Sequence, residues 1–290
     1  MGCVRRSSIS LVLCLCAVCG ACVGQPLPAK QASEIYARAT NQFSAALFFK
    51  PAQATNSDLA CQLAPLIIQE AAHGQAADAS SCDQFGTLHV SHGFASIDPS
   101  RPAVCWTADS VQLNGRLHAR FLYQWWYPPR KPPGQPPALP RQGIRITLDT
   151  RGQPAVWEVL ADISGLRLVF ISQGLEAASA AQFGEPLPGR RHSIERSLKQ
   201  APSVVVARTI DDGPQAMGPI AYLSKGTRNV STLICRCMPA QVKSLRTKAT
   251  YELLPLSAIP GDMSLLRRGL WPSDAPSGKR LEARLRLADF

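Results

Sequence analysis

Four acidic residues in this sequence could act as a general acid or base. Glu158 alternates with Trp157 in an apolar segment, and a glutamate buried in such a segment can donate a proton to a substrate. Asp162, Asp211 and Asp212 lie at predicted strand ends and turns, where any of them could supply a second acid. These residues are the candidates for catalysis.

Glu158 also has a structural interpretation. A buried glutamate more often forms an ion pair, here with either Arg145 or Arg167 on a neighbouring predicted strand. We favour this ion pair and therefore expect a binding protein rather than an enzyme. The alternative function is an envelope-polymer hydrolase that uses Glu158 and a second acid.

Two cysteines lie in the segment VSTLICRCMPAQ, residues 230–241. If this segment is a strand, Cys235 and Cys237 lie on one face with Leu233, which favours a role as small buried hydrophobes. Their Cα atoms would be roughly 6.5–7 Å apart, at the limit for a disulfide bond. Two thiolates supply half of a zinc site. Metal or redox handling by this pair is the second alternative function, and we expect no cofactor.

Export would also favour disulfide bonds, because exported proteins fold in oxidising compartments. The cysteines after residue 25 are Cys61, Cys82, Cys105, Cys235 and Cys237. Five cysteines cannot all pair within one chain. Cys61 with Cys82 is one candidate bridge, and Cys105 with either Cys235 or Cys237 is another.

The distribution of charge predicts the kind of partner. Residues 25–100 contain 3 basic and 6 acidic side chains, whereas residues 101–290 contain 26 and 14. A basic body in an exported protein indicates an anionic partner such as lipid headgroups, an acidic wall polymer or a glycan. A nucleic-acid partner is not expected outside the cytoplasm.

A predicted hairpin provides a surface for this partner. Asn114-Gly115 separates two alternating segments, which is a strong hairpin signal. Alternation after the turn places Leu117, Ala119, Phe121, Tyr123, Trp125 and Tyr127 on the core face, and His118, Arg120, Leu122, Gln124 and Trp126 on the outer face. The predicted binding surface consists of Arg116, Arg120, Trp126 and Arg145.

The first 24 residues resemble a secretory signal peptide. Arg5 and Arg6 precede a 15-residue apolar stretch and then small residues. A membrane-spanning helix needs about 20 residues, so we expect no transmembrane helix in the mature chain. Cleavage near Gln25 is one expectation, and a lipoprotein-type cleavage before Cys22, with lipidation there, is the alternative. The protein is then exported to the envelope, the periplasm or the medium.

The remaining chain divides by pattern into three parts. Residues 25–97 are predicted to be helical, with helices at 33–49 and 57–72 and a break at Pro65. Residues 98–258 are predicted to be β-rich: an antiparallel meander from Val104 to Ser172, a proline-rich loop at 128–140, a helix at 175–183 and later strands at 203–209, 220–224 and 231–237. Residues 259–290 form a basic tail. The predicted fold class is α+β, with a small helical N-terminal part packed on a predominantly antiparallel sheet.

Overall fold

The computed structural model describes residues 46–53, 58–70, 84–91, 94–129, 140–160, 167–223, 228–237, 248–259 and 278–290. In chain order, its elements are β1 (Ala46–Pro51), α2 (Leu59–Gln62), β2 (Leu66–Glu70), β3 (Thr87–Ser91), β4 (Phe94–Asp98), β5 (Ala103–Leu113), β6 (Arg116–Trp126), β7 (Arg141–Leu148), β8 (Pro154–Val159), β9 (Arg167–Ser172), α3 (Gln173–Phe183), β10 (Val204–Ile210), β11 (Gly218–Leu223), β12 (Val230–Cys237), β13 (Lys248–Pro255), the 3-10 turn η2 (Leu256–Ala258) and α5 (Gly278–Arg284). The predicted signal peptide, Cys22 and most of the predicted proline-rich loop at 128–140 lie outside the described residues.

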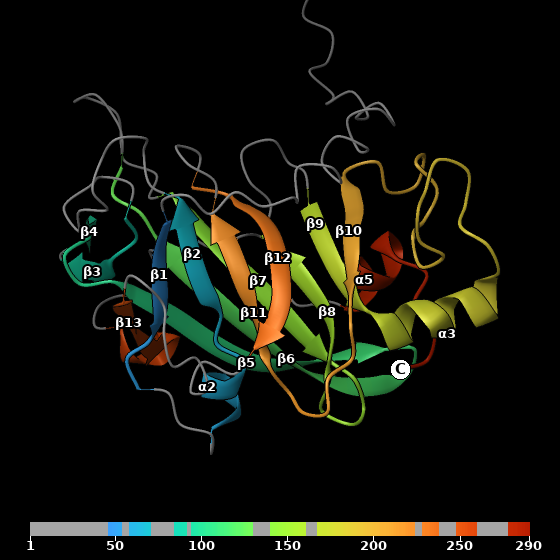
Figure 1. The fold of residues 1–290 in the computed structure, drawn as a ribbon, viewed down its shortest axis with the longest axis horizontal. Coiled ribbons are helices and arrows are strands. Elements are labelled where there is room, and N and C mark those ends of the chain that lie inside the picture. The colour runs from blue at the N-terminus through green and yellow to red at the C-terminus, as the bar shows by residue number, and fades with distance from the viewer. Residues whose placement is uncertain are drawn as a thin grey trace, which may run out of the picture.

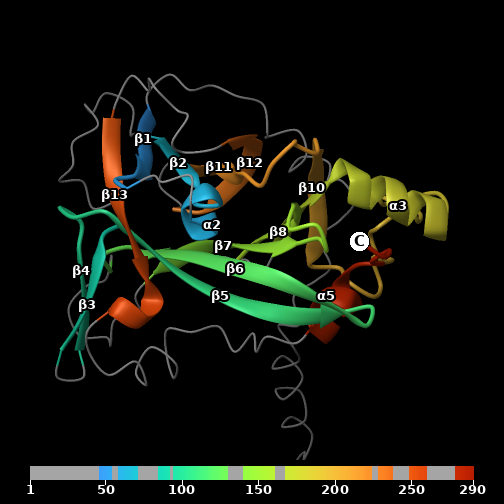
Figure 2. The ribbon, with the colours of Figure 1, turned by 90° about the horizontal axis from the view of Figure 1, so that it is seen from below.

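Eleven of the strands form one mixed sheet. Its order is β10-β9-β8-β7-β6-β5-β13-β1-β2-β11-β12, and β3 pairs with β4 in a separate two-stranded sheet. The pairs β9–β10, β5–β13, β1–β13 and β2–β11 are parallel. The large sheet curls until its edge strands β10 and β12 contact each other, so that it is nearly closed (Figure 1). Figure 2 shows β1, β2, β11 and β12 facing β5, β6 and β7 across the interior.

The curled sheet has an apolar core on each face. The inner core includes Phe49, Trp125, Trp157 and Tyr251, which come from strands on opposite sides of the interior. On the outer face, strand residues such as Val156 and Val206 pack with the buried leucines of α5 and of the C-terminal segment, residues 285–290. Because both faces are covered, simple alternation of polar and apolar residues does not identify the solvent-exposed face.

The predicted fold class is wrong, because the N-terminal part is mostly strand. Within the predicted helix at 33–49, residues 46–49 belong to β1, and the preceding residues lie outside the described part. In the predicted helix at 57–72, α2 has only four residues and β2 begins directly after Pro65. Proline cannot continue a helix, and the apolar run from Leu66 to Ile68 is buried as a strand. A short buried strand and a helix segment have similar apolar patterns, which explains the error.

The prediction for the central region is confirmed. Strands β5 to β9 form a consecutive antiparallel meander. Asn114 (φ 47°) and Gly115 (φ 78°) form the β5–β6 turn with the positive φ angles that a tight hairpin requires. The helix predicted at 175–183 is the C-terminal part of α3, and the three later strands correspond to β10, β11 and β12.

Alternation correctly assigns Phe121, Tyr123, Trp125 and Tyr127 to the core, but the prediction that the opposite face of β6 is exposed to solvent is wrong. Leu117, assigned to the core, is 70% exposed, whereas His118 is only 2% exposed. His118 stacks on Phe290 with ring centroids 4.5 Å apart, and its Nδ1 lies 2.9 Å from the Leu148 carbonyl oxygen. The C-terminal segment therefore covers the face that alternation assigned to solvent.

Candidate functional site

Glu158 lies in an ion-pair cluster on the outer face of the sheet. Its Oε1 is 3.2 Å from Arg167 Nη1 and 3.5 Å from Arg284 Nη1, and its Oε2 is 3.4 Å from Arg145 Nη1. The strand register places Arg145 directly opposite Glu158. The predicted ion pair is confirmed: Glu158 contacts both of the candidate partners, Arg145 and Arg167, and α5 adds Arg284. At 2% exposure, the carboxylate has little access to a substrate.

The structure does not bring Glu158 together with the other candidate acids that it describes. Asp212 Oδ2 accepts a 2.7 Å hydrogen bond from the Gly174 amide at the start of α3. Gly174 lies two residues after the last residue of β9, whereas the Glu158 partner Arg167 is the first. Glu158 is itself paired with Val169 within β9, whereas Asp212 is anchored beyond the end of this strand, so the structure holds the two carboxylates apart. Asp211 is exposed beside Asp212, and Asp162 lies outside the described residues.

The cysteine predictions concern residues that the structure describes only in part. Cys105 is a free, buried thiol, and burial, followed by the negative charge of Glu252, raises its pKa to about 12. A thiol with this pKa is unreactive near neutral pH. Cys61 is half-buried, and its Sγ lies 3.5 Å from the carboxylate of Asp58.

The other cysteine side chains lie outside the described part. Cys82 is not described, and for Cys235 and Cys237 only the backbone in β12 is. Four strands separate β5 from β12, so the sheet does not make Cys105 a neighbour of that pair. Among the residues that the structure describes, no three His, Cys, Asp or Glu side chains gather as a metal site would require.

Of the four residues in the predicted basic surface, only Arg116 is exposed. Arg116 is exposed and lies 3.6 Å from Asp289, but Arg120 is buried against the carboxylate of Asp109. Trp126, predicted to face outward, is buried in the small cluster beneath β3 and η2. Arg145 belongs to the Glu158 cluster. The described Arg and Lys side chains after residue 100 that are exposed are Arg101, Arg116, Arg151, Arg191 and Lys199, and the other ten are buried or half-buried.

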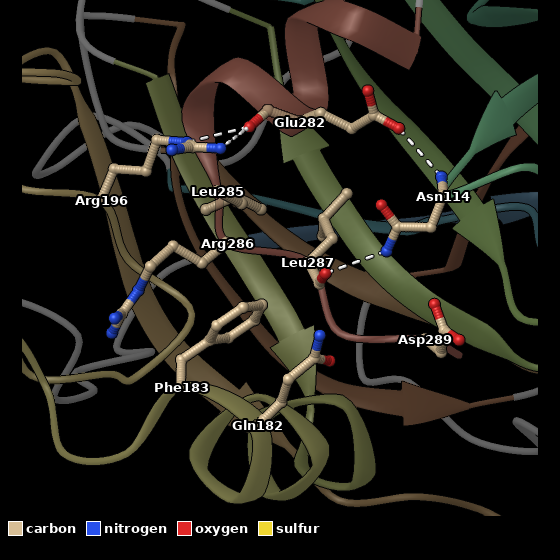
Figure 3. Close-up of a pocket in the computed structure, with 9 residues that line it drawn as sticks. All are labelled: Asn114, Gln182, Phe183, Arg196, Glu282, Leu285, Arg286, Leu287 and Asp289. Atoms are coloured by element: carbon tan, nitrogen blue, oxygen red, sulfur yellow. Dashed lines mark hydrogen bonds between the residues drawn. The ribbon is translucent and has the colours of Figure 1, made fainter.

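Instead, two arginines line a pocket on the outer side of the molecule. The pocket has a volume of about 530 Å³ and lies between the end of α3, the β5–β6 turn and the C-terminal region (Figure 3). Its lining residues are Asn114, Gln182, Phe183, Arg196, Glu282, Leu285, Arg286, Leu287 and Asp289. Arg196 and Glu282 lie at one end and Gln182 and Phe183 at the other, as Figure 3 shows.

Backbone carbonyl groups hold both arginines. Arg196 Nε and Nη2 donate to the Glu282 carbonyl oxygen at 2.9 and 2.6 Å. Arg286 Nη2 donates to the Ser193 carbonyl oxygen, and its guanidinium carbon lies 5.4 Å from the centroid of the Phe183 ring. Within the described part of the chain, neither guanidinium pairs with a carboxylate. Both positive charges are therefore fixed in position without being neutralised.

The acidic residues of the pocket have other partners. Glu282 Oε1 accepts a 2.9 Å hydrogen bond from the Asn114 amide, and Asp289 pairs with Arg116. The Asn114 side chain in turn donates to the Leu287 carbonyl oxygen at 2.9 Å. These contacts tie the β5–β6 turn to the C-terminal region and hold the pocket wall in place.

Little in the sequence indicates this pocket. Asn114 was recognised only as a turn residue, and Arg286 only as part of a basic tail. The contacts that form the pocket join residues about 170 positions apart in the chain, such as Asn114 and Leu287. Within the described residues, Arg196 and Arg286 bind backbone carbonyl groups rather than carboxylates, and this could not be inferred from their neighbours in the chain.

Comparison of the chain with protein-family models, with curated proteins and with solved structures finds no match. Function must therefore be inferred from the residues of this chain. The described helices include none that is both long and apolar enough to cross a membrane.

Proposed function

We propose that this chain is an exported, non-catalytic binding protein that holds an anionic partner in the pocket formed by α3, the β5–β6 turn and the C-terminal region. The observation that supports binding is the pair Arg196 and Arg286, whose charges are fixed by carbonyl groups rather than neutralised by carboxylates. The signal-peptide pattern in the first 24 residues supports export.

Arginine is well suited to this role. Its planar guanidinium presents several N–H donors that match the oxygens of a carboxylate or a phosphate. Arg196 uses Nε and Nη2 on one carbonyl oxygen, and no described residue accepts from its Nη1. An incoming anion would gain a charged hydrogen bond without displacing an existing carboxylate partner.

The distribution of the other basic residues also favours a local site. Most of the described arginines after residue 100 are buried or half-buried, so the excess of 26 basic over 14 acidic side chains is not spread as an exposed layer over the described surface. A partner attracted by the net positive charge would then be held at the pocket, which two unneutralised guanidiniums line.

Binding of anionic probes to charge-matched variants tests this proposal. The double variant Arg196→Gln, Arg286→Gln should bind a polyuronate, polyphosphate or anionic vesicles at least tenfold more weakly at low salt, because each charged hydrogen bond contributes about 1.5–3 kcal/mol. The control Arg101→Gln, Arg151→Gln removes the same charge from exposed positions and should bind like the wild type. Equal losses in both double variants would show that net charge, not the pocket, holds the partner.

A further inference from the structure

The chemistry of the whole pocket indicates a particular class of anion. Resting on the proposed function, we propose that the pocket binds an acidic saccharide, a sugar carrying a carboxylate, with its carboxylate at Arg196 and its hydroxyl groups toward Gln182 and Asp289. The inference depends on the uncharged and acidic side chains that surround the two arginines.

The acidic side chains disfavour a densely charged ligand. Glu282 and Asp289 line the same pocket as Arg196 and Arg286, so the lining contains two carboxylates and two guanidiniums. A phosphate or polyphosphate would be repelled by both carboxylates. A ligand with one carboxylate and several hydroxyl groups is different, because its hydroxyl groups can donate to those carboxylates while its charge meets a guanidinium.

A free carboxamide suits a ligand rich in hydroxyl groups. The Gln182 side chain is exposed, lines the pocket and makes no hydrogen bond within the described part of the chain. Its amide offers two donors and one acceptor oxygen, and each sugar hydroxyl can both donate and accept. Gln182 lies at the end of the pocket opposite Arg196 (Figure 3). The two residues could therefore contact different groups of one ligand.

The pocket also contains an aromatic ring. Phe183 is half-buried, and the Arg286 guanidinium lies over the ring at 5.4 Å from its centroid. Because the ring also lines the pocket, part of it remains available to a ligand. The C–H face of a sugar ring is apolar and can pack against an aromatic surface, whereas inorganic phosphate gains nothing from it.

Hydrogen bonds within the chain hold the walls of the pocket in place. The tight turn at Asn114 is tied to Leu287, and Arg196 is held by the carbonyl oxygen of Glu282. A volume of about 530 Å³ lies within the range of about 300–1,000 Å³ usual for small-ligand sites. Preorganised walls reduce the entropy that the protein loses on binding.

Calorimetric titration of the full mature chain tests the inference with four probes. These are an oligogalacturonide, the matching neutral galacto-oligosaccharide, inorganic phosphate and anionic lipid vesicles. We expect saturable binding of the oligogalacturonide, with at least tenfold weaker binding of the neutral sugar and of phosphate. Arg196→Gln should weaken oligogalacturonide binding at least tenfold, and Gln182→Ala and Phe183→Leu should each weaken it about fivefold, while Arg101→Gln leaves it unchanged.

The outcomes separate this inference from the proposed function. If phosphate or vesicles bind as tightly as the oligogalacturonide, and Gln182→Ala has no effect, the saccharide is rejected although the anion site stands. If none of the three anionic probes binds, both proposals fail. Circular dichroism shows whether each variant is folded. Gln182→Ala changes an exposed side chain, so its result decides the matter even if Phe183→Leu does not fold.

Discussion

Two buried glutamates in this protein differ in the donors that surround them. Glu195 accepts from Arg190 Nη1 at 3.2 Å and from the amides of Arg191, His192 and Val206 at 3.1 Å each. Glu158 instead faces three guanidiniums at 3.2–3.5 Å. Both side chains are 2% exposed. The same residue type at the same depth is therefore held by the backbone in one region and by side-chain charge in the other.

The difference reflects the local architecture. Glu195 lies in the irregular segment between α3 and β10, where few backbone groups are paired in a β-ladder. The Glu195 carboxylate therefore accepts hydrogen bonds from backbone amides, and Arg190 donates to backbone carbonyl oxygens. Those carbonyl oxygens belong to Ala201, Val204 and Arg196. Glu158 lies within a strand whose backbone is already paired, and its charge instead connects three elements. A carboxylate thus organises a loop in one case and joins strands to a helix in the other.

The largest loss in the free energy of unfolding should come from Glu195→Gln. Oε1 accepts from Arg190 and Val206, and Oε2 accepts from Arg191 and His192, so the new NH₂ group faces two donors in either orientation. The change also leaves Arg190 buried without its counter-ion. We expect a loss of about 3–5 kcal/mol in the free energy of unfolding, measured by urea denaturation. A loss below 1 kcal/mol would show that the loop does not depend on this carboxylate.

Glu158→Gln should have a smaller effect, about 1–3 kcal/mol in the same measurement. The glutamine NH₂ can face Arg145, whose side chain is 11% exposed and can turn toward water. The contacts of Glu158 are also longer than the 2.7–2.9 Å of a strong charged hydrogen bond. If Glu158→Gln is as costly as Glu195→Gln, the contrast between the two regions is wrong.

Arg284→Gln should cause the smallest loss in the free energy of unfolding. Its side chain is 24% exposed, and Glu158 keeps Arg145 and Arg167 after the change. We expect a loss of about 0.5–1 kcal/mol that becomes smaller at high salt, because exposed ion pairs are screened. Unfolding at two salt concentrations measures this, with Arg101→Gln as a surface control. A loss that does not change with salt would mean that Arg284 acts through packing.

Several elements could be predicted because their signals are local. Asn114-Gly115 requires positive φ angles whatever surrounds it, and Pro65 ends a helix in any context. The partners Arg145 and Arg167 of Glu158 followed from the pairing of neighbouring strands. The predictions failed where burial comes from distant chain: β2 was mistaken for a helix, and His118 was placed on the surface although Phe290 covers it.

The turns, the meander from Val104 to Ser172 and the excess of basic residues follow from the sequence alone, because they depend on residue type and short-range spacing. Which arginines are neutralised depends instead on the three-dimensional fold. Arg145 and Arg167 meet a glutamate across paired strands, whereas Arg196 and Arg286 meet backbone carbonyl groups after the chain returns to the β5–β6 turn. Net charge is a property of composition, but an unneutralised charge depends on which groups the fold places within a few ångströms.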